Sequence, residues 1–453
     1  MPRGSSLKVG ISGIRGIVGE TLTPQLVTTF AEAFGSFVGP GSVIVGRDTR
    51  ASGEMVKNAV FAGLLAVGCK PIDVGISPVP SILIKTNRTD AIGAIAITAS
   101  HNPVQWNALK FVGRGGLFLN RYEAQELLDI YHQSEFALVE TDLYMSVVRD
   151  DDPVKEHFAA VLDYLDVEAI LKRKFKVVYD ACNGAGSTFT PRFLELLGCE
   201  VIGINNVPDG VFPRNPEPKA ENITQLCETV KAEKADIGFA QDADADRLAI
   251  VDENGRAIGE ELSVALAVKH VLSRERGPVV VNLSTTAIVD RIAAEFDCPV
   301  IRTRIGEVNV AEAMIAHKAV IGGEGNGGVM VPAIHPCRDS FAGMGIVLQM
   351  LAEKGKTVSQ LVSELPSYVM VKHTVACSTE VAHSAMTSLR KKHTQDGTVD
   401  TIDGLKITYP DGSWIHIRPS NTEPVMRLTA ESPSAERARD LPRRFAEEIS
   451  SLC

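Results

Sequence analysis

The stretch FKVVYDACNGAG, residues 175–186, is followed by PRFLELL (191–197) and then by GCEVIGI (198–204). An apolar run that ends in polar and glycine residues, a helical pattern and a second apolar run together predict a strand, a helix and a parallel strand. Because such crossovers are almost always right-handed, this stretch predicts one unit of an α/β domain with parallel strands.

The same order of elements occurs twice more in the chain. SVIVGRD (42–48) leads through a helical stretch to GCKPIDV (68–74), and GPVVVNLSTT (277–286) leads to DCPVIRT (297–303). In all three copies a cysteine stands just before the second apolar run. The sequence therefore predicts three similar α/β domains.

The chain after about residue 370 has a different pattern. LKITY (405–409), the turn PDGS (410–413) and WIHIRPS (414–420) predict a β-hairpin, and hence a smaller α+β fourth domain. Turn residues and charge runs interrupt the periodicity near three places along the chain. The predicted domains are 1–153, 154–258, 259–368 and 369–453.

Composition excludes several classes of function. A chain of 453 residues with 45% hydrophobic and 23% charged residues is typical of a soluble multidomain enzyme. The formal net charge of -10 argues against a nucleic-acid partner. Without a signal-peptide pattern or a long apolar run, we expect a cytoplasmic protein with no membrane partner. Eight cysteines without a CxxC pair predict reduced thiols rather than a disulfide frame or a zinc site.

The motif ITASHNP, residues 97–103, changes abruptly from a buried-strand composition to a hydroxyl, an imidazole and an amide. Such a change predicts that Ser100 and His101 lie at the end of a strand, where α/β proteins commonly have their binding and catalytic residues. A histidine alone is more often a satisfied structural residue.

The motif DADADR, residues 242–247, lies between two apolar strands. A tight loop would bring the carboxylates of Asp242, Asp244 and Asp246 around one divalent cation. An EF-hand is excluded because Arg247 stands where that loop needs glycine. A solvated acidic turn is the alternative, but three clustered like charges cost stability unless a cation neutralises them.

Two further motifs point to a phosphorylated sugar. In GGEGNGGV (322–329), glycines allow close approach of the backbone while Glu324 and Asn326 can bind vicinal hydroxyls. In RPSNTEP (418–424), a guanidinium, hydroxyls and an amide suit a phosphate. Taken singly, the first could be an empty glycine turn and the second an ordinary helix cap. The sequence has no GxxxxGK[ST] motif, so it offers no recognisable binding site for a nucleotide that would donate the phosphoryl group.

Five motifs in order, SGIRG (12–16), TASHNP, DADADR, GEGNGG and RPSNTEP, resemble the α-D-phosphohexomutase superfamily over nearly the whole chain. The resemblance implies three α/β domains with mixed sheets around a central cleft, plus a smaller C-terminal α+β domain. It also implies an intramolecular phosphotransferase that interconverts hexose 6-phosphate and hexose 1-phosphate through a phosphoserine and a 1,6-bisphosphate intermediate.

The resemblance also implies the roles of individual residues. Ser100 is the phosphoserine and, with Asp242, Asp244 and Asp246, a ligand of Mg²⁺. Lys110 is the general acid/base, and His101, Arg15 and Arg247 support the phosphoserine. Glu324 and Asn326 bind the sugar. The clamp for the phosphate that is not transferred consists of Arg418, Ser420, Asn421, Thr422 and Arg427.

Substrate choice is less sharply indicated. DADADR and GEGNGG are similar to the archaeal-type phosphoglucosamine mutase branch, whose members are often also named phosphomannomutase or phosphoglucomutase. The expected activator is glucose or another hexose 1,6-bisphosphate, and the expected assembly is a monomer or homodimer. A metal-dependent sugar phosphatase and a non-catalytic sugar-phosphate sensor are the alternatives from other classes.

Overall fold

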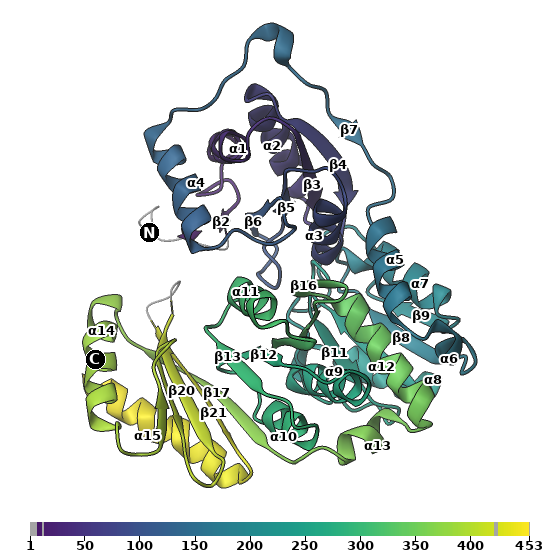
Figure 1. Ribbon diagram of the computed structural model, residues 1–453, viewed down its shortest axis with the longest axis vertical. Coiled ribbons are helices and arrows are strands. Elements are labelled where there is room, and N and C mark those ends of the chain that lie inside the picture. The colour runs from purple at the N-terminus through teal and green to yellow at the C-terminus, as the bar shows by residue number, and fades with distance from the viewer. Residues whose placement is uncertain (1–6, 11–12, 421–424, 453) are drawn as a thin grey trace. The chain divides into compact units, whose positions relative to one another are not determined.

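The computed structural model describes residues 7–10, 13–420 and 425–452 (Figure 1). It divides into two compact units, each built from two segments of the chain. Unit 1 comprises residues 1–263 and 326–360, and unit 2 comprises residues 264–325 and 361–453. Helices α9 (Glu260–Arg274) and α13 (Val358–Ser363) run across two of the division points.

The first sheet of unit 1 is mixed, with the strand order β1-β2-β6-β5-β3-β4-β7. Its parallel part pairs β3 with β4 and β5, and β4 with β7, whereas β1, β2 and β6 pair antiparallel. Every side chain of β5 is buried, as expected for a central strand covered on both faces. The strands are β1 (Lys8–Gly10), β2 (Gly13–Ile17), β3 (Ser42–Arg47), β4 (Lys70–Ile76), β5 (Gly93–Ile97), β6 (Trp106–Gly113) and β7 (Val148–Arg149).

Helices cover both faces of this sheet. Three helices, α1 (Pro24–Val38), α2 (Gly53–Ala66) and α4 (Arg121–Gln133), share one apolar core with alternate residues of the strands, such as Val43 and Val45. On the opposite face, α3 (Val79–Arg88) brings Ile82 so close to Gly46 that a Cβ there would lie 2.6 Å from it. A short 3₁₀ turn, Thr141–Leu143, precedes β7.

The second sheet of unit 1 contains the stretch on which the fold prediction depends. Strands β8 (Lys176–Asp180) and β9 (Glu200–Ile204) are parallel and are joined by α7 (Gly186–Leu196), so the predicted strand–helix–strand unit is confirmed. The strand order is β11-β10-β8-β9, with β11 antiparallel. The other elements are α5 (Lys155–Tyr164), α6 (Val167–Leu171), a 3₁₀ turn at Ala220–Asn222, α8 (Thr224–Glu233), β10 (Ile237–Gln241) and β11 (Leu248–Val251).

The second chain segment of unit 1 forms a hairpin and a buried helix. Strands β15 (Gly328–Val331) and β16 (His335–Arg338) are antiparallel. Helix α12 (Ser340–Lys354) begins at Asp339, whose side chain accepts a hydrogen bond from the N–H of Phe341. Nearly the whole length of α12 is buried. This segment therefore packs as part of the core of unit 1.

Unit 2 begins with a parallel sheet. Strand β12 (Val279–Asn282) pairs in parallel with β13 (Val300–Thr303) and with β14 (Ile321–Glu324). Helices α10 (Ile288–Glu295) and α11 (Glu307–His317) make the connections between these strands. The predicted third strand–helix–strand unit is present here.

The rest of unit 2 is an antiparallel sheet, β17-β21-β20-β19-β18, covered on one face by α14 (Thr379–Lys392) and α15 (Ala435–Leu452), as Figure 1 shows. The predicted hairpin is confirmed, because β19 and β20 pair antiparallel around the PDGS turn. The strands are β17 (Val369–Ala376), β18 (Thr398–Asp400), β19 (Leu405–Thr408), β20 (Trp414–Pro419) and β21 (Val425–Ser432).

The architecture confirms the predicted fold class, with mixed sheets in α/β domains followed by an α+β domain. Among the described residues, the cysteines at 69, 182, 199, 227, 298 and 337 lie outside any disulfide. Cys377 is disulfide-bonded, so the expectation of reduced thiols throughout is wrong at that position. Among the helices of the described residues, none is long and apolar enough to span a bilayer.

Candidate active site

The predicted phosphoserine position lies in the turn that joins β5 to β6. Ser100 is almost fully buried and has a φ of 48°, a left-handed conformation that is uncommon for residues other than glycine. Its backbone N–H donates to Thr98 Oγ1 at 2.9 Å, and Thr98 Oγ1 donates to Asp48 Oδ2 at 2.7 Å. The turn is therefore held in one conformation at the end of the parallel strands β3 and β5.

The DADADR motif forms the loop between β10 and β11, and its three carboxylates are fully buried. Ligand oxygens from Asp242, Asp244 and Asp246 lie within 4.8 Å of one another. Asp244 Oδ1 and Asp246 Oδ1 have no hydrogen-bond partner among the described residues. Buried carboxylate oxygens without partners are costly unless a cation binds them. The cluster thus fits a divalent metal ion.

Electrostatics within the cluster point the same way. Burial, reinforced by the charges of Asp244 and Asp246, raises the pKa of Asp242 well above its usual range. Burial would also raise the pKa of Asp244, but the Lys110 ammonium, a hydrogen bond with Asp242 and the charge of Arg338 together outweigh it, and the pKa of Asp244 is lowered. A divalent cation bound by the cluster would relieve the repulsion among the three carboxylates that contributes to the raised pKa of Asp242.

Ser100 and the aspartate loop meet directly. Ser100 Oγ donates a hydrogen bond to Asp242 Oδ2 at 2.9 Å. Lys110, on β6, places its Nζ 2.8 Å from Asp244 Oδ2 and is itself nearly buried. Two segments more than a hundred residues apart in the sequence therefore bring a nucleophilic oxygen, a carboxylate cluster and an ammonium group together.

Cationic and imidazole groups surround Ser100 as well. Arg15 Nη1 donates to Asn102 Oδ1 at 2.5 Å, and Arg247 Nη2 donates to His101 Nδ1 at 3.1 Å. Burial, with the charges of Arg247 and Arg15 adding to it, lowers the pKa of His101 to about 2. His101 is therefore neutral, and because its Nδ1 accepts a hydrogen bond, its proton is assigned to Nε2.

Four residues of this site were not identified from the sequence. Arg338 Nη2 donates to Asp246 Oδ2 at 2.6 Å, and Glu217 Oε1 accepts from Arg247 Nη1 at 3.3 Å. Asp48 and Arg50 lie in the GRDTR turn directly after β3. Because β3 and β5 are parallel neighbours, the strand-end rule that pointed to Ser100 applies equally to this turn. For Arg338 and Glu217 the sequence carries no comparable signal.

The two predicted sugar-binding residues belong to different units. Glu324, at the end of β14 in unit 2, is buried, and its Oε1 accepts from Asn282 Nδ2 and from the N–H of Gly306, both at 2.9 Å. Asn326, in unit 1, is partly exposed, and its Oδ1 accepts from the N–H of Gly328 at 3.1 Å. Two donors therefore fix the carboxylate of Glu324, whereas the side-chain amide of Asn326 stabilises the turn in which it lies.

The predicted phosphate clamp lies in unit 2. Arg418 on β20 stands directly opposite Arg427 on β21, and the N–H of Ser420 donates to Val425 O at 2.8 Å. Burial, partly opposed by Asp403 and reinforced by Arg427, lowers the pKa of Arg418. Glu324 also acts electrostatically on Arg418, which brings the two predicted subsites of unit 2 into one neighbourhood. Asn421 and Thr422 lie outside the described residues.

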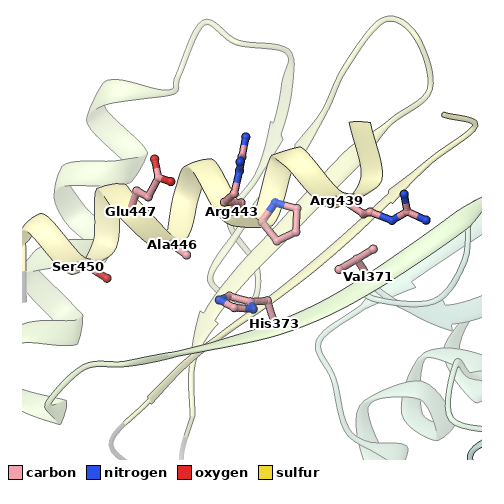
Figure 2. A pocket seen from close by; sticks show the side chains of 8 residues that line it. Val371, His373, Arg439, Arg443, Ala446, Glu447 and Ser450 are labelled. Carbon is pink, nitrogen blue, oxygen red and sulfur yellow. The ribbon is translucent and has the colours of Figure 1, made fainter. Parts of the chain in front are cut away.

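A separate cavity of about 500 Å³ lies between α15 and β17 of unit 2 (Figure 2). Arg439 and Arg443 approach it from the helix, and His373 approaches it from the strand. None of the predicted site residues that the structure describes lines this cavity. It is therefore distinct from the cluster around Ser100.

Family models match most of the chain in four consecutive blocks. They describe the α/β/α domains I, II and III of phosphoglucomutase/phosphomannomutase, at residues 6–138, 155–255 and 260–368, and its C-terminal domain, at residues 374–448. The first block contains the motifs SGIRG and TASHNP, and the next three blocks contain DADADR, GEGNGG and RPSNTEP in that order.

Full-length relatives carry related names. A protein of Methanopyrus kandleri named probable phosphoglucosamine mutase is 38% identical over 449 residues, covering 97% of each chain. A phosphoglucomutase/phosphomannomutase of Thermococcus kodakarensis is 39% identical over 440 residues, covering 95% of this chain and 96% of its own. A crystal structure of a phosphoglucomutase/phosphomannomutase family protein from Burkholderia thailandensis matches with a TM-score of 0.84, 28% identity and 98% coverage of both chains. This chain belongs to the α-D-phosphohexomutase superfamily and is an isomerase that transfers phosphoryl groups.

Proposed function

We propose that this enzyme interconverts hexose 6-phosphate and hexose 1-phosphate through a phosphorylated Ser100 and a hexose 1,6-bisphosphate intermediate. The observation that carries the proposal is the 2.9 Å hydrogen bond between Ser100 Oγ and Asp242, inside a cluster of three buried carboxylates with Lys110 beside it. Phosphoryl transfer depends chiefly on positioning and on neutralising charge, and this cluster offers both.

Asp242, Asp244 and Asp246 would hold Mg²⁺, with an oxygen of the phosphorylated Ser100 as a further ligand. The ion would supply neutralisation of the charge on the transferring phosphoryl group. Arg15 and Arg247 add fixed cations next to the turn that carries Ser100. Because His101 is neutral, it offers a hydrogen-bond donor at Nε2 but no positive charge that would compete with Mg²⁺ for the carboxylates.

In the first transfer, a sugar hydroxyl oxygen forms a bond to phosphorus while the bond from phosphorus to Ser100 Oγ breaks. In the second transfer, Ser100 Oγ forms the bond to the opposite phosphorus while the bond from that phosphorus to the sugar oxygen breaks. Lys110 would act in the first transfer after it has lost a proton: its neutral amine accepts the hydroxyl proton, and the resulting ammonium donates a proton to Ser100 Oγ. The second transfer runs these proton movements in reverse. The intermediate then turns end for end, and the opposite phosphate is returned to Ser100. Because the enzyme starts phosphorylated, the weakly nucleophilic serine hydroxyl need not attack first.

Glu324 and Asn326 would bind sugar hydroxyls in both orientations. The phosphate that is not being transferred would be held by Arg418, Ser420, Asn421, Thr422 and Arg427. Support comes from unit 2, where Arg418 faces Arg427 and burial lowers the pKa of Arg418, so that an anion between them would be favourable.

Glucosamine phosphate is the proposed substrate, with mannose and glucose phosphates as the alternative. The name of the Methanopyrus kandleri relative supports the first, and the name of the Thermococcus kodakarensis relative supports the second. A metal-dependent sugar phosphatase is less well supported, because phosphate release to water has no need for a second phosphate clamp.

The proposal also covers the partner, the cellular location, the assembly and the domain boundaries of the protein. The net charge of -10 supports a small-molecule phosphosugar as partner rather than nucleic acid or membrane. We propose a cytoplasmic monomer or homodimer, activated by a hexose 1,6-bisphosphate. We also keep the boundaries 1–153, 154–258, 259–368 and 369–453 as a proposal.

A coupled assay tests these proposals. Glucosamine 6-phosphate, mannose 1-phosphate and glucose 1-phosphate are each supplied with and without the matching 1,6-bisphosphate. A mutase gives the isomeric sugar phosphate and responds to the bisphosphate, a phosphatase releases inorganic phosphate, and a sensor binds without turnover. Intact mass of the purified protein, before and after loading with the bisphosphate, tests whether one phosphate is attached to Ser100.

A further inference from the structure

Arg50 is a fully buried arginine whose side-chain hydrogen bonds go to Asp48 and to the turn that carries Ser100 rather than to the three clustered aspartates. It lies in the turn after β3, on the strand next to the one that leads into the Ser100 turn. Its position raises the question of what a buried guanidinium does there, since taking such a charge out of water is costly unless every donor is satisfied.

All of the donors of Arg50 are used, and most of them are used on one loop. Nε donates to Asp48 Oδ2 at 2.9 Å. The two terminal nitrogens donate to four backbone carbonyls of the segment 100–106. These are Ser100 O at 2.8 Å, Asn102 O at 2.7 Å, Pro103 O at 2.6 Å and Trp106 O at 3.0 Å.

Two further contacts hold the guanidinium of Arg50 in place. Asp48, which pairs with Arg50, also accepts from Thr98 Oγ1, the atom that receives the N–H of Ser100. The ring of Phe212 lies over the guanidinium face at 4.9 Å. One planar group therefore ties together both sides of a residue whose left-handed φ is unfavourable for a serine.

We propose that Arg50 is the positioning residue of the phosphoryl-transfer turn: it holds the carbonyls of residues 100, 102, 103 and 106 so that Ser100 Oγ stays directed at Asp242. The inference rests on the proposed role of Ser100. Lysine cannot replace this function, because a single ammonium cannot donate in one plane to four carbonyls and a carboxylate.

The first test compares Arg50→Lys with Lys57→Met in the full-length protein. Lys57 is also buried in the first domain and pairs with Asp73 at 2.9 Å, but it does not touch the Ser100 turn. We expect Arg50→Lys to lower kcat about 100-fold with KM changed less than about threefold, since small misplacements of reacting groups cost this much. Lys57→Met should lower thermal stability without a comparable loss of kcat. Equal loss of kcat in the two variants would overturn the proposal.

The second test is amide hydrogen exchange, which does not require turnover. In the wild type, the amides of Ser100, Asn102 and Trp106, which donate to Thr98 Oγ1, Ala99 O and Pro103 O, should exchange far more slowly than those of an unstructured peptide. In Arg50→Lys, exchange of these three amides should rise at least about tenfold while that of β3 stays unchanged. Rapid exchange of the three amides in the wild type would overturn the proposal even if the variant does not fold. A wild type without mutase turnover would instead refute the proposed function and leave the exchange result to decide the role of Arg50.

Discussion

The carboxylate cluster of unit 1 and the arginine pair of unit 2 are opposite solutions to binding a charged ligand. In unit 1, three buried carboxylates gather next to Ser100, and two of their oxygens have no hydrogen-bond partner among the described residues. In unit 2, Arg418 and Arg427 face each other across two strands, and burial lowers the pKa of Arg418. The first site accumulates negative charge for a cation, and the second accumulates positive charge for an anion.

This contrast in charge predicts which part of the reaction is lost when each site is altered. Loss of a group in the carboxylate cluster or of Ser100 should stop chemistry while the sugar phosphate still binds. Loss of a group in unit 2 should weaken binding of the sugar phosphate while Ser100 can still be phosphorylated. Variants that do not separate in this way would contradict the proposed division of labour.

The largest effect is expected for Ser100→Ala. Removing the oxygen that carries the phosphoryl group should lower kcat by more than about a thousandfold, because the phosphoenzyme can no longer form. Binding of the sugar phosphate, measured by calorimetry, should stay within about threefold of the wild type. Ordinary turnover by this variant would remove Ser100 from the mechanism.

The next effect concerns the metal. At about one hundred times its Kd, Mg²⁺ should stabilise the wild type by about 2.7 kcal/mol, seen as a higher unfolding temperature, and chelation should abolish turnover. In Asp242→Asn the stabilisation by Mg²⁺ should disappear. The metal-free variant should be at least as stable as the metal-free wild type, because one of three repelling buried charges is gone. Undiminished stabilisation by Mg²⁺ in this variant would place the ion elsewhere.

A smaller effect is expected for Arg418→Ala in unit 2. Loss of a charge-assisted contact to phosphate should lower kcat/KM by roughly 30-fold to 100-fold, largely through KM. The phosphorylated fraction of Ser100, measured by intact mass, should equal that of the wild type. A variant that loses phosphorylation but keeps its KM would contradict the assignment of the arginine pair to the distal phosphate.

The extent to which the sequence predicts this molecule follows from the range of the interactions involved. Strand–helix–strand units such as 175–204 are local patterns, and the structure confirms them. The meeting of Ser100 with Asp242 was anticipated through the resemblance, since neither motif alone specifies the other. The contact of Arg338 with Asp246 depends on packing of a segment some ninety residues away, which no local periodicity encodes.

Arg50 shows a different reason for a missed residue. Its turn follows a strand, as the Ser100 turn does, so the strand-end rule covered it. Its contribution nevertheless consists of donation to backbone carbonyls, which have no sequence identity of their own. Groups that act on side chains leave recognisable motifs, whereas a group that acts on the backbone does so only in the folded chain.

The smallest effect is a pH dependence confined to unit 2. His416 Nδ1 accepts from Ser284 Oγ at 2.8 Å, and its other nitrogen donates to Asp403 O. Burial, which the hydrogen bond to Asp403 only partly offsets, lowers the pKa of His416 to about 4. The ordinary value of about 6.5 applies in the unfolded chain. Between these values the unfolded state binds more protons, so stability is present above about pH 6.5 and is lost as the pH falls towards 4.

Unit 2 should therefore lose about 2 kcal/mol of stability from this group between pH 7 and pH 5. Urea unfolding followed by the fluorescence of the buried Trp414, in a Trp106→Phe background, measures unit 2 separately from unit 1. His416→Gln should flatten the pH dependence, because glutamine keeps hydrogen-bonding capacity but does not titrate. His383→Gln, at an exposed position of α14, should leave it unchanged. A dependence that survives His416→Gln would assign the protonation to another titratable group of unit 2 and would contradict the role given to His416.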